Sequence, residues 1–315
     1  MRIVMPGGTG QVGGFVARWL QSQGHSVQII GRSVSDPALR WDARTLGDWA
    51  DAIDGADAVI QLTGRSVNCR YNWPNLREMM NSRVDSALVV GQAIAQAQKP
   101  PAVWLQASTA TIYPHTLGPA LDEGAPVGQP TPGVPAYWSY SVNIARSWEL
   151  ALMRQPLPHT RRVAMRFGFA MSPDRGGVFD WLMWVVRRGL GGPFYSGNQF
   201  VSWVTDRDVA GAIGQMLADD RLEGPVNVTA PEPLTNQRFM AVLRQAAGVR
   251  VGLPVLPGMA EAGAWMLGTD VELMRKSRRA VPAKLLNAGF TFQDSCWEDA
   301  APDLVRRWRN GEVLG

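Results

Sequence analysis

The stretch Met5-Pro6-Gly7-Gly8-Thr9-Gly10-Gln11-Val12-Gly13 decides the fold, because a glycine-rich turn here joins a short apolar segment to an amphipathic one. Gly7 permits a tight turn, Gly10 lets the backbone approach a pyrophosphate, and Gly13 lets a helix lie close to the preceding strand. The start of that helix directs free N–H groups and a positive dipole end at phosphates. The spacing G-x-x-G-x-x-G therefore predicts a dinucleotide-binding turn. The residues expected against the cofactor are Gly7, Thr9, Gly10, Gln11 and Val12.

Short apolar runs alternate with longer helical patterns on the C-terminal side of this turn. The runs are Ile3–Met5, Ser26–Ile30, Ala58–Leu62, Val103–Ala107 and Arg162–Phe167. They are typical of parallel strands that are buried on both faces. A helical stripe consists of Val12, Phe15, Val16, Trp19 and Leu20, and further helical patterns cover 76–96 and 138–153. This alternation predicts an α/β fold with a doubly wound, Rossmann-type parallel sheet.

The pattern changes after Ser172, where glycine-rich loops become frequent and strands become fewer. We expect an NAD(P)-binding domain over residues 1–170, with later segments free to return to it. Residues 171–250 are expected to form a substrate-binding region. Pro254 and Pro257 mark the start of a small helical C-terminal domain over 251–315. The proline-rich segment 122–135 is expected to be a surface loop.

Composition excludes several classes of protein. Of the 315 residues, 46% are hydrophobic and 18% are charged, which fits a folded chain with a substantial core. No apolar run is long enough to span a membrane, and the apolar N-terminal stretch is too short for a signal peptide. We therefore expect a cytoplasmic protein with no membrane partner. Cys69 and Cys296 are predicted to be unpaired thiols, and they offer no metal-binding spacing.

The net charge of +4 includes two basic clusters, at residues 275–279 and 306–309. Either cluster could bind nucleic acid, but both lie among helix-forming residues with apolar neighbours. We therefore predict solvated helix faces and no nucleic-acid partner. The charge also suits an anionic ligand. We expect a small-molecule substrate, with an anion among the possibilities, and a monomer or homodimer.

The ends of the next two strands indicate which dinucleotide is bound. An acidic residue after the second strand would hold the ribose hydroxyls of NAD, but Arg32 and Ser33 stand there. A guanidinium and a hydroxyl suit the 2′-phosphate of NADP, so NADP(H) is favoured over NAD(H). In the alternative, Arg32 points to solvent and Asp36 holds the ribose. After the third strand, Leu62, Thr63 and Gly64 let the cofactor pass close to the backbone, unless this is an ordinary turn.

Several motifs spread over nearly the whole chain resemble those of one enzyme group. They are Gly7-Gly8-Thr9-Gly10, Gln61-Leu62-Thr63-Gly64, Ala107-Ser108-Thr109, Ser147-Trp148-Glu149, Met165-Arg166-Phe167-Gly168, Gly191-Gly192-Pro193, Ser202-Trp203-Val204, Asn227-Val228-Thr229-Ala230-Pro231, Pro282-Ala283-Lys284-Leu285 and Gly289-Phe290. With these motifs the chain resembles the extended, epimerase-like branch of the short-chain dehydrogenase/reductase superfamily. More narrowly, it is similar to a subgroup of nucleoside-diphosphate-sugar epimerases that carry a small C-terminal domain of unknown function.

The resemblance implies a mechanism that uses a serine or threonine, a tyrosine and a lysine four residues after it. Thr109 matches the hydroxyl position, and Ser108 beside it is assigned to the cofactor. The tyrosine and lysine positions fall on Ser141 and Ala145, and the helix 138–153 contains no lysine. A tyrosine with a pKa near 10 is a poor base at neutral pH unless a cation lies beside it.

Three interpretations remain open for the chemistry. The enzyme could use another residue, with Tyr113, Tyr140 and Arg166 as candidates. It could be a reductase in which Thr109 and a tyrosine only polarise a carbonyl group. It could instead bind NADPH without turnover, as a regulatory protein or a sensor.

The second half of the chain offers candidates for binding the substrate. Arg166 ends a strand and could meet an acidic group, although an ion pair with Glu149 is equally compatible with the sequence. Asn198 and Gln199, together with Trp203, could line a polar pocket. The segment around Trp203 also reads as the start of a helix, with Asp206 as its N-cap.

Overall fold

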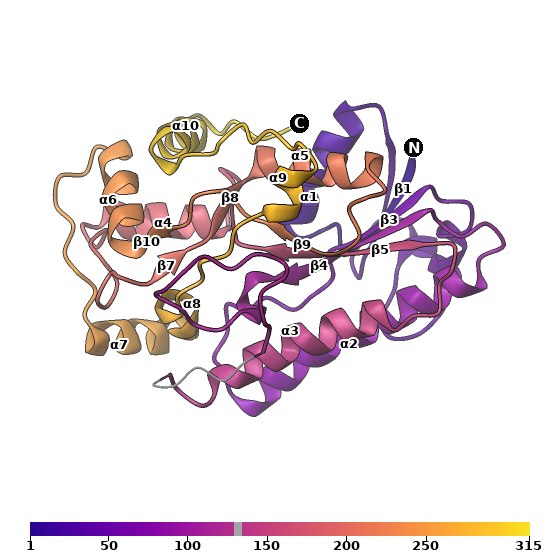
Figure 1. Ribbon diagram of the computed structural model, residues 1–315, viewed down its shortest axis with the longest axis horizontal. Coiled ribbons are helices and arrows are strands. Elements are labelled where there is room, and N and C mark those ends of the chain that lie inside the picture. Colours follow the sequence, from indigo (N-terminus) through magenta and orange to yellow (C-terminus); the bar gives the residue numbers. More distant parts are fainter. Residues whose placement is uncertain (129–133) are drawn as a thin grey trace.

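A six-stranded parallel sheet forms the centre of the computed structural model, which describes residues 1–128 and 134–315 (Figure 1). Its strand order is β2-β1-β3-β4-β5-β9. These strands are β1 (Arg2–Pro6), β2 (Ser26–Ile30), β3 (Ala58–Gln61), β4 (Val103–Thr109), β5 (Arg161–Phe167) and β9 (Gly224–Val228). The five strands predicted from the sequence are confirmed, as is the Rossmann-type class. Because the strand order reverses at β1, a ligand crevice is expected between the carboxyl ends of β1 and β3.

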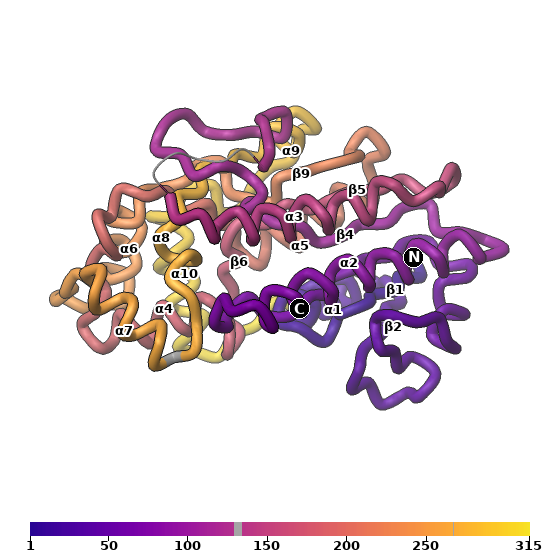
Figure 2. The backbone as a smooth tube through the Cα atoms, turned by 90° about the horizontal axis from the view of Figure 1, so that it is seen from below, coloured from indigo at the N-terminus to yellow at the C-terminus, as the bar shows by residue number. Residues whose placement is uncertain are grey.

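Helices cover both faces of this sheet (Figures 1 and 2). One face carries α1 (Gln11–Ser22) and α5 (Asp206–Ala218), and the other carries α2 (Trp73–Gln96) and α3 (Trp138–Met153). The alternation of side chains along β1 explains the two layers, because Ile3 and Met5 join one core and Val4 joins the other. Each fully buried side chain of this kind contributes roughly 1.5–3 kcal/mol.

A smaller lobe is built around its own apolar core. Its helices include α4 (Val178–Arg187), α6 (Asn236–Ala246) and α10 (Trp297–Asn310), and two short sheets pair β6 (Phe169–Met171) with β8 (Trp203–Thr205) and β7 (Phe200–Val201) with β10 (Leu234–Thr235). Trp297 holds this core together, because its ring stacks on Phe239 at 4.2 Å and meets Trp203 at 4.9 Å between ring centroids. The lobe is continuous with the main sheet, since β9 follows α5 and returns to pair with β5.

Short helices complete the chain. They are the 3-10 turns η1 (Pro37–Leu39), η2 (Asp48–Ala52) and η3 (Ala110–Ile112), and the helices α7 (Pro257–Leu267), α8 (Glu272–Arg275) and α9 (Ala283–Asn287). The segment after α8 crosses the molecule, where the Ser277 backbone N–H donates to His115 Nδ1 and the Arg278 backbone N–H donates to the Phe200 carbonyl. Residues 276–281 therefore join the smaller lobe to the loop that follows β4.

The first basic cluster is not the solvated helix face that the sequence predicted. Lys276, Ser277 and Arg278 are buried, and α8 ends before them at Arg275. Lys276 and Arg278 donate to the carbonyl and hydroxyl oxygens of Thr111 in η3, and Ser277 donates to the Thr116 carbonyl beyond it, so these side chains leave water with hydrogen bonds that come from no carboxylate. The prediction failed because a run of charged residues indicates exposure to water, whereas the hydrogen-bond acceptors that allow its burial lie far away in the sequence.

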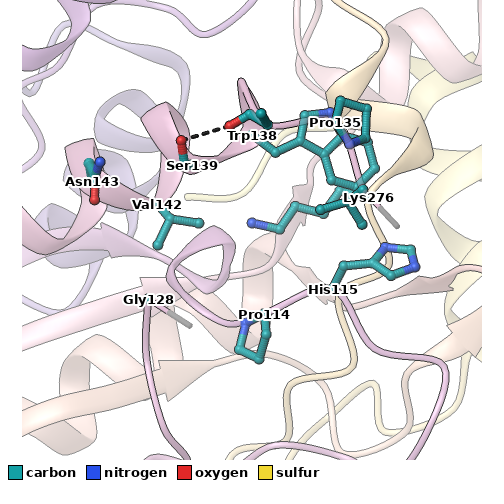
Figure 3. Close-up of a pocket in the computed structure, with 11 residues that line it drawn as sticks. Pro114, His115, Gly128, Pro135, Trp138, Ser139, Val142, Asn143 and Lys276 are labelled. Atoms are coloured by element: carbon teal, nitrogen blue, oxygen red, sulfur yellow. Dashed lines mark hydrogen bonds between the residues drawn. The ribbon is translucent and has the colours of Figure 1, made fainter. Parts of the chain in front are cut away.

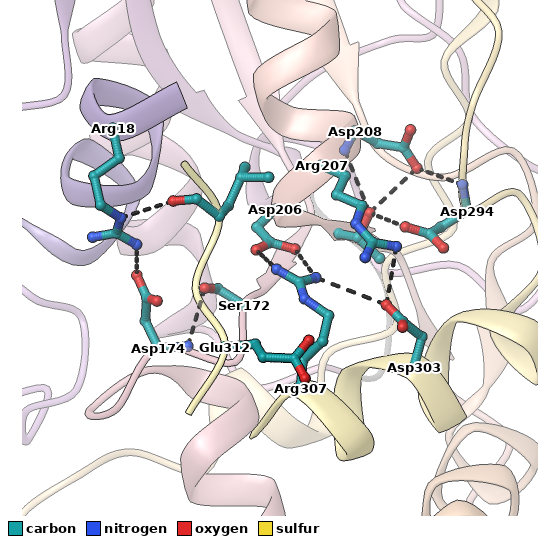
Figure 4. Close-up of polar contacts among 12 residues, drawn as sticks. Arg18, Ser172, Asp174, Asp206, Arg207, Asp208, Asp294, Asp303, Arg307 and Glu312 are labelled. Carbon is teal, nitrogen blue, oxygen red and sulfur yellow. Dashed lines mark hydrogen bonds and ion pairs between the residues drawn. The ribbon is translucent and has the colours of Figure 1, made fainter. Parts of the chain in front are cut away.

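The second cluster and the start of α5 also differ from expectation. Arg307 is buried and forms a paired contact with Asp206, with its Nη1 and Nη2 atoms 2.9 and 2.7 Å from the carboxylate oxygens (Figure 4). Asp206 is therefore not the N-cap of α5. Thr205 takes that place, and its hydroxyl accepts from the Asp208 backbone N–H at 3.4 Å.

The expected loop over 122–135 is described only on both sides of residues 129–133, which lie outside the described residues. On the near side it is anchored rather than loose, because the buried Glu123 accepts from the backbone N–H groups of Asn227 and Lys284. Within the described ranges, no helix combines the length and apolar character that crossing a membrane requires.

Candidate functional site

The glycine turn lies tightly against the end of β3. Gly7 adopts a left-handed φ of 79°, and a Cβ atom there would lie 2.6 Å from the Thr63 backbone nitrogen. A Cβ on Gly13 would lie 2.5 Å from the Gly8 carbonyl oxygen, so α1 can sit close to the turn only with glycine there. Gly10 is exposed, and its nearest neighbour would be 3.7 Å away. The turn therefore has one crowded side and one open side.

The start of α1 has donors without acceptors. Gly10 is its N-cap and supplies no side-chain hydrogen bond, and the first turn contains no acidic residue. The first N–H groups of a helix have no partner inside the helix, so those of Gln11 and Val12 are available to a ligand. In the described structure, Gln11 Nε2 and Thr63 Oγ1 are also buried without hydrogen-bond partners. Orphaned polar atoms around a cradle of backbone amides fit the diphosphate of a dinucleotide.

Two arginines flank the end of β2. Arg32 and Ser33 are exposed, and Arg32 has no hydrogen bond or ion pair among the described residues. The alternative residue Asp36 already accepts from the Ala38 backbone N–H at 2.9 Å, where it caps η1. The chain then brings Arg40 back beside Gly31 in an isolated bridge. The sequence analysis missed Arg40, because only the turn at η1 places it near Arg32.

The carboxyl ends of β4 and β5 hold a buried polar network. Ser108 donates to Glu149 Oε1 at 2.5 Å, and Arg166 binds the same carboxylate through Nε at 2.9 Å and Nη2 at 2.8 Å. Burial would lower the pKa of Arg166, but its hydrogen bonds with Glu149 raise it overall. The structure thus gives Arg166 the ion pair that the sequence left open. The Arg166 guanidinium is buried and bound by Glu149, and Ser108 is likewise engaged inside the protein, so a substrate contact of Arg166 stays an untested prediction.

Tyr113 belongs to the same network and not to an open site. Its hydroxyl donates to Asn227 Oδ1 at 2.9 Å and accepts from Arg166 Nη1 at 2.8 Å, and only 1% of the residue is exposed. Burial raises the pKa of Tyr113, and the nearby Arg166 only partly opposes this. The phenol therefore joins β4, β5 and β9 through hydrogen bonds inside the protein, and its catalytic role stays a prediction.

The other two catalytic candidates lie at different places. Thr109 is half-buried at the end of β4, and its Oγ1 accepts from the Thr111 backbone N–H at 3.1 Å. This leaves the Thr109 hydroxyl proton free to donate to a ligand. Tyr140 is half-buried on α3, where its ring meets Trp73 of α2 edge-on at 4.9 Å. Thr109 thus stays at the carboxyl edge of the sheet, while the Tyr140 ring packs between two helices.

The substrate candidates of the second half do not form a polar pocket. Trp203 has no exposed surface, and its indole N–H donates to the Glu232 carbonyl. Gln199 is buried and donates to the carbonyls of Phe194 and Met274, at 2.9 and 3.2 Å. Asn198 is exposed, whereas Trp203 and Gln199 are buried. The Gln199 and Trp203 side chains thus hold the smaller lobe together, and their expected substrate roles stay untested predictions.

A cluster from the C-terminal segment covers the turn after β4 instead. Lys276 Nζ donates to the Thr111 carbonyl at 2.7 Å, and Arg278 Nε donates to Thr111 Oγ1 at 3.0 Å. Glu272, which has no exposed surface, accepts from Ser141 Oγ at 2.5 Å. Ser141 is the α3 position at which the resemblance expects the tyrosine. These groups escaped the sequence analysis, and their only signal was the charge of the stretch around them.

Burial perturbs the titration of this cluster. It raises the pKa of Glu272, against the opposing effects of Arg278 and Ser141. It lowers the pKa of Lys276 to about 7, and the charge of Arg278 acts in the same direction. It also raises the pKa of Tyr71, to which the charge of Glu272 adds. Strongly perturbed groups gathered at a strand end are a common feature of functional sites.

A pocket of about 110 Å³ lies beside this cluster (Figure 3). It is lined by Pro114, His115, Gly128, Val134, Pro135, Ala136, Trp138, Ser139, Val142, Asn143 and Lys276. Figure 3 shows the Lys276 side chain reaching across it between α3 and the loop that follows β4. The pocket is small and mostly apolar, so it can take only a few ligand atoms.

Comparison with known proteins gives relatives over nearly the full length. Epimerase family protein SDR39U1 of Bos taurus is 29% identical over 297 residues, which cover 93% of this chain and 95% of the relative. YfhF of Bacillus subtilis, also an epimerase family protein, is 27% identical over 314 residues and covers 97% and 98%. The crystal structure of human SDR39U1 (isoform 2) with NADPH is 26% identical, with a TM-score of 0.84 over 97% of this chain and 99% of that chain.

Two family patterns match the chain. Residues 262–304 match a domain of unknown function, DUF1731, which confirms the expected relationship to epimerases that carry such a C-terminal domain. Residues 3–229 match the NAD dependent epimerase/dehydratase family. That match takes in the glycine turn, the whole parallel sheet and the helices on its faces. The chain belongs to the NAD dependent epimerase/dehydratase family.

Proposed function

We propose that this chain is an NADP(H)-dependent oxidoreductase or epimerase-like enzyme that acts on a small molecule. The observation that carries the proposal is the open cradle at the end of β1. The first amide N–H groups of α1 have no acceptor there, and Gln11 Nε2 and Thr63 Oγ1 have no hydrogen-bond partner. A diphosphate with its ribose oxygens would satisfy all of them. The NADPH in the human relative supports the same interpretation.

The residues around this cradle would hold the cofactor, which when bound would supply or accept a hydride. Gly7, Gly10 and the first turn of α1 would bind its diphosphate. Leu62 and Gly64 would allow its middle section to pass near β3. Further along, Thr9 lies beside Gly31 and would face the adenosine side. These assignments rest on the open positions of the turn and on its crowding against β3.

NADP(H) is preferred over NAD(H) in this proposal. Arg32 and Ser33 stand exposed where a 2′-phosphate would lie. The backbone of Arg40 lies next to Gly31, and its guanidinium donates to the carbonyls of Val34 and Ser35. The carboxylate of Asp36, which could have favoured NAD by binding the ribose, is held by the backbone of η1. The Arg32 guanidinium and the Ser33 hydroxyl at one strand end suit a dianion better than a pair of hydroxyls.

Thr109 is the proposed hydrogen-bond donor to the oxygen of the substrate. Its hydroxyl lies at the carboxyl end of β4, and its acceptor side is already used by Thr111. Donation to a carbonyl oxygen would stabilise the negative charge that develops there during reduction. If turnover is found, Thr109→Ala should lower kcat; brisk turnover that survives this change would remove Thr109 from the mechanism.

A second function, NADPH binding without turnover as a sensor or regulator, is favoured by one observation. The expected lysine position, Ala145, is fully buried among apolar side chains and cannot hold a proton or a ribose. Both functions require NADPH binding, but only the first requires oxidation of NADPH by a carbonyl compound. We expect that oxidation to be slow or undetectable with generic ketones and aldehydes.

The first test is a titration with both reduced nucleotides. We expect NADPH to bind with a calorimetric signal, to raise the Tm, and to bind more tightly than NADH. Gly13→Val is the matched control, because its side chain would displace α1 from the turn. The proposal fails if the wild-type protein gives neither heat nor thermal stabilisation with either nucleotide.

A further inference from the structure

Glu272 is a buried carboxylate with one unused oxygen. Its Oε2 accepts from Ser141, while its Oε1 is buried and has no hydrogen-bond partner among the described residues. A buried polar atom without a partner is costly and rare in folded proteins, and it commonly marks the place of a ligand atom. Glu272 therefore offers an acceptor that this chain leaves free.

The cations near Glu272 do not neutralise it by contact. Within the part of the chain that the structure describes, no ion pair of 4.0 Å or less involves Glu272. Lys276 and Arg278 instead donate to Thr111, in the turn that follows β4. Glu272 stays apart from them, with a serine as its single donor.

Three elements bring titratable or charged groups toward this carboxyl. They are Tyr137 at the start of α3, Tyr71 in the chain that leads to α2, and Asp270, Lys276 and Arg278 on the segment of Glu272 itself. Burial is the largest influence and raises the pKa of Glu272. A buried carboxyl with a raised pKa can serve as a proton donor as well as a proton acceptor.

The cluster lies at the edge of the sheet where ligands of parallel folds bind. Thr111, which accepts the hydrogen bonds of Lys276 and Arg278, is two residues after Thr109 at the carboxyl end of β4. In doubly wound sheets the reacting part of a ligand is held outside these strand ends. The C-terminal segment thus adds a proton-exchanging group to an edge where α3 itself has no lysine and Tyr113 is fully engaged.

We propose that Glu272 is the acid–base residue of the site, an inference that rests on the proposed function. In the oxidative direction its carboxylate would accept the proton of a substrate hydroxyl. The carbon that bears this hydroxyl would lose a hydride to NADP⁺, so that a carbonyl group forms. In the reductive direction the protonated carboxyl returns the proton to the carbonyl oxygen as the carbon receives a hydride from NADPH. Ser141 is a positioning residue, which holds Oε2 and leaves Oε1 without a partner in the protein.

The decisive comparison uses Glu272→Gln and the control Glu232→Gln, which changes an exposed glutamate. The probe is NADPH alone, and the readout is the infrared difference between the bound and free protein. We expect the wild-type protein to show a carboxyl band that shifts when NADPH binds. That band should be absent in Glu272→Gln and unchanged in Glu232→Gln. Where a carbonyl compound is reduced, Glu272→Gln should slow NADPH oxidation about 100-fold or more.

Ser141→Ala provides a second, milder variant that keeps the carboxyl group. The hydrogen bond from Ser141 lowers the pKa of Glu272, so its removal should move the titration midpoint of the same infrared band to higher pH. A serine whose hydroxyl does not bind this carboxyl would change the Tm without moving that midpoint. This measurement remains decisive if Glu272→Gln does not fold.

The outcomes separate this inference from the proposed function. A wild-type protein that does not bind NADPH would overturn the proposed function, and Glu272 as its acid–base residue with it. Normal NADPH binding together with an unchanged carboxyl band in Glu272→Gln, or an unmoved midpoint in Ser141→Ala, would overturn the role of Glu272 alone. Wild-type turnover and pH profile in Glu272→Gln would do the same.

Discussion

Arg32 and Lys276 carry the same charge in opposite surroundings. Arg32 is exposed at the end of β2, where its guanidinium keeps all its donors for a ligand. Lys276 is 3% exposed and is held by the Thr111 carbonyl. At the scale of single residues, the surroundings therefore decide whether a cationic side chain is available to bind an anion or has its pKa lowered by burial.

Arg32→Ala should weaken the binding of NADPH roughly tenfold to a hundredfold and leave NADH unaffected. The reason is the loss of charge-assisted hydrogen bonds to the 2′-phosphate, which are worth about 1.5–3 kcal/mol. Calorimetric titration with both nucleotides measures the difference. Arg250→Ala, which removes another exposed arginine, should change neither affinity. Equal losses of NADPH and NADH affinity in Arg32→Ala would contradict the phosphate assignment.

Lys276 should make stability depend on pH in the alkaline range. Its pKa is about 7 in the folded protein, so between pH 7 and the ordinary lysine pKa of 10.5 the unfolded chain binds more protons than the folded one. The free energy of unfolding should therefore rise with pH through this window, because the cost of burying the ammonium disappears. Urea unfolding of the wild type and of Lys276→Met at pH 6.5 and 9 tests this. The difference in free energy of unfolding, variant minus wild type, should be smaller at pH 9 than at pH 6.5. The same difference in free energy of unfolding at both pH values would contradict this prediction.

At the scale of elements, α1 shows how two adjacent glycines can differ in purpose. A Cβ on Gly13 would collide with the Gly8 backbone at 2.5 Å, whereas a Cβ on Gly14 would meet only the Arg18 side chain at 3.6 Å. Gly13 thus sets the distance between α1 and the turn. Gly14 is a helix-interior glycine that an alanine could replace, because nothing rigid stands in its way.

Gly13→Ala should lower the free energy of unfolding by about 1–3 kcal/mol, because backbone atoms must move to admit the methyl group. It should also weaken NADPH binding, since α1 presents the amides of the cradle. Gly14→Ala should be neutral or stabilising by up to about 1 kcal/mol. Chemical denaturation of both variants gives the comparison. The packing argument is wrong if the two substitutions have the same effect.

At the scale of the whole molecule, one buried ion pair joins the helices of the two lobes. Asp206 begins α5 on the main sheet, and Arg307 lies 101 positions later on α10 (Figure 4). Both side chains are almost completely buried, at 0% and 4% exposure. Removing one partner of such a pair leaves the other charge without compensation in a dry environment.

Arg307→Met should therefore lower the free energy of unfolding by about 3–5 kcal/mol. Arg306→Ala, one position earlier, removes an exposed arginine that pairs with Asp303 and Glu312, and it should cost at most about 1 kcal/mol. Urea unfolding followed by tryptophan fluorescence measures both. An Arg307→Met protein as stable as Arg306→Ala would show that this pair does not hold α10 in place.

The sequence by itself determined the core of the fold. The strands from β1 to β5, the helices α1, α2 and α3 and the glycine turn all follow from local periodicity and from glycine chemistry. These features depend on neighbours a few positions away, so a single sequence contains them. The same local reasoning placed Arg32, Ser33 and Thr63 at strand ends, since strand ends are where apolar runs stop.

Only the tertiary structure decided which charged side chains are buried and what they meet. Glu272 and Ser141 are 131 positions apart, and Tyr113 and Asn227 are 114 apart. Whether a polar group faces water or a partner depends on contacts between such distant segments, and no local pattern records them. For this reason the stretch 275–279 was mistaken for a solvated face, and the internal partners of Arg166, Gln199 and Trp203 could not be identified from the sequence. Burial satisfied by remote partners is a property of the folded chain, not of any stretch within it.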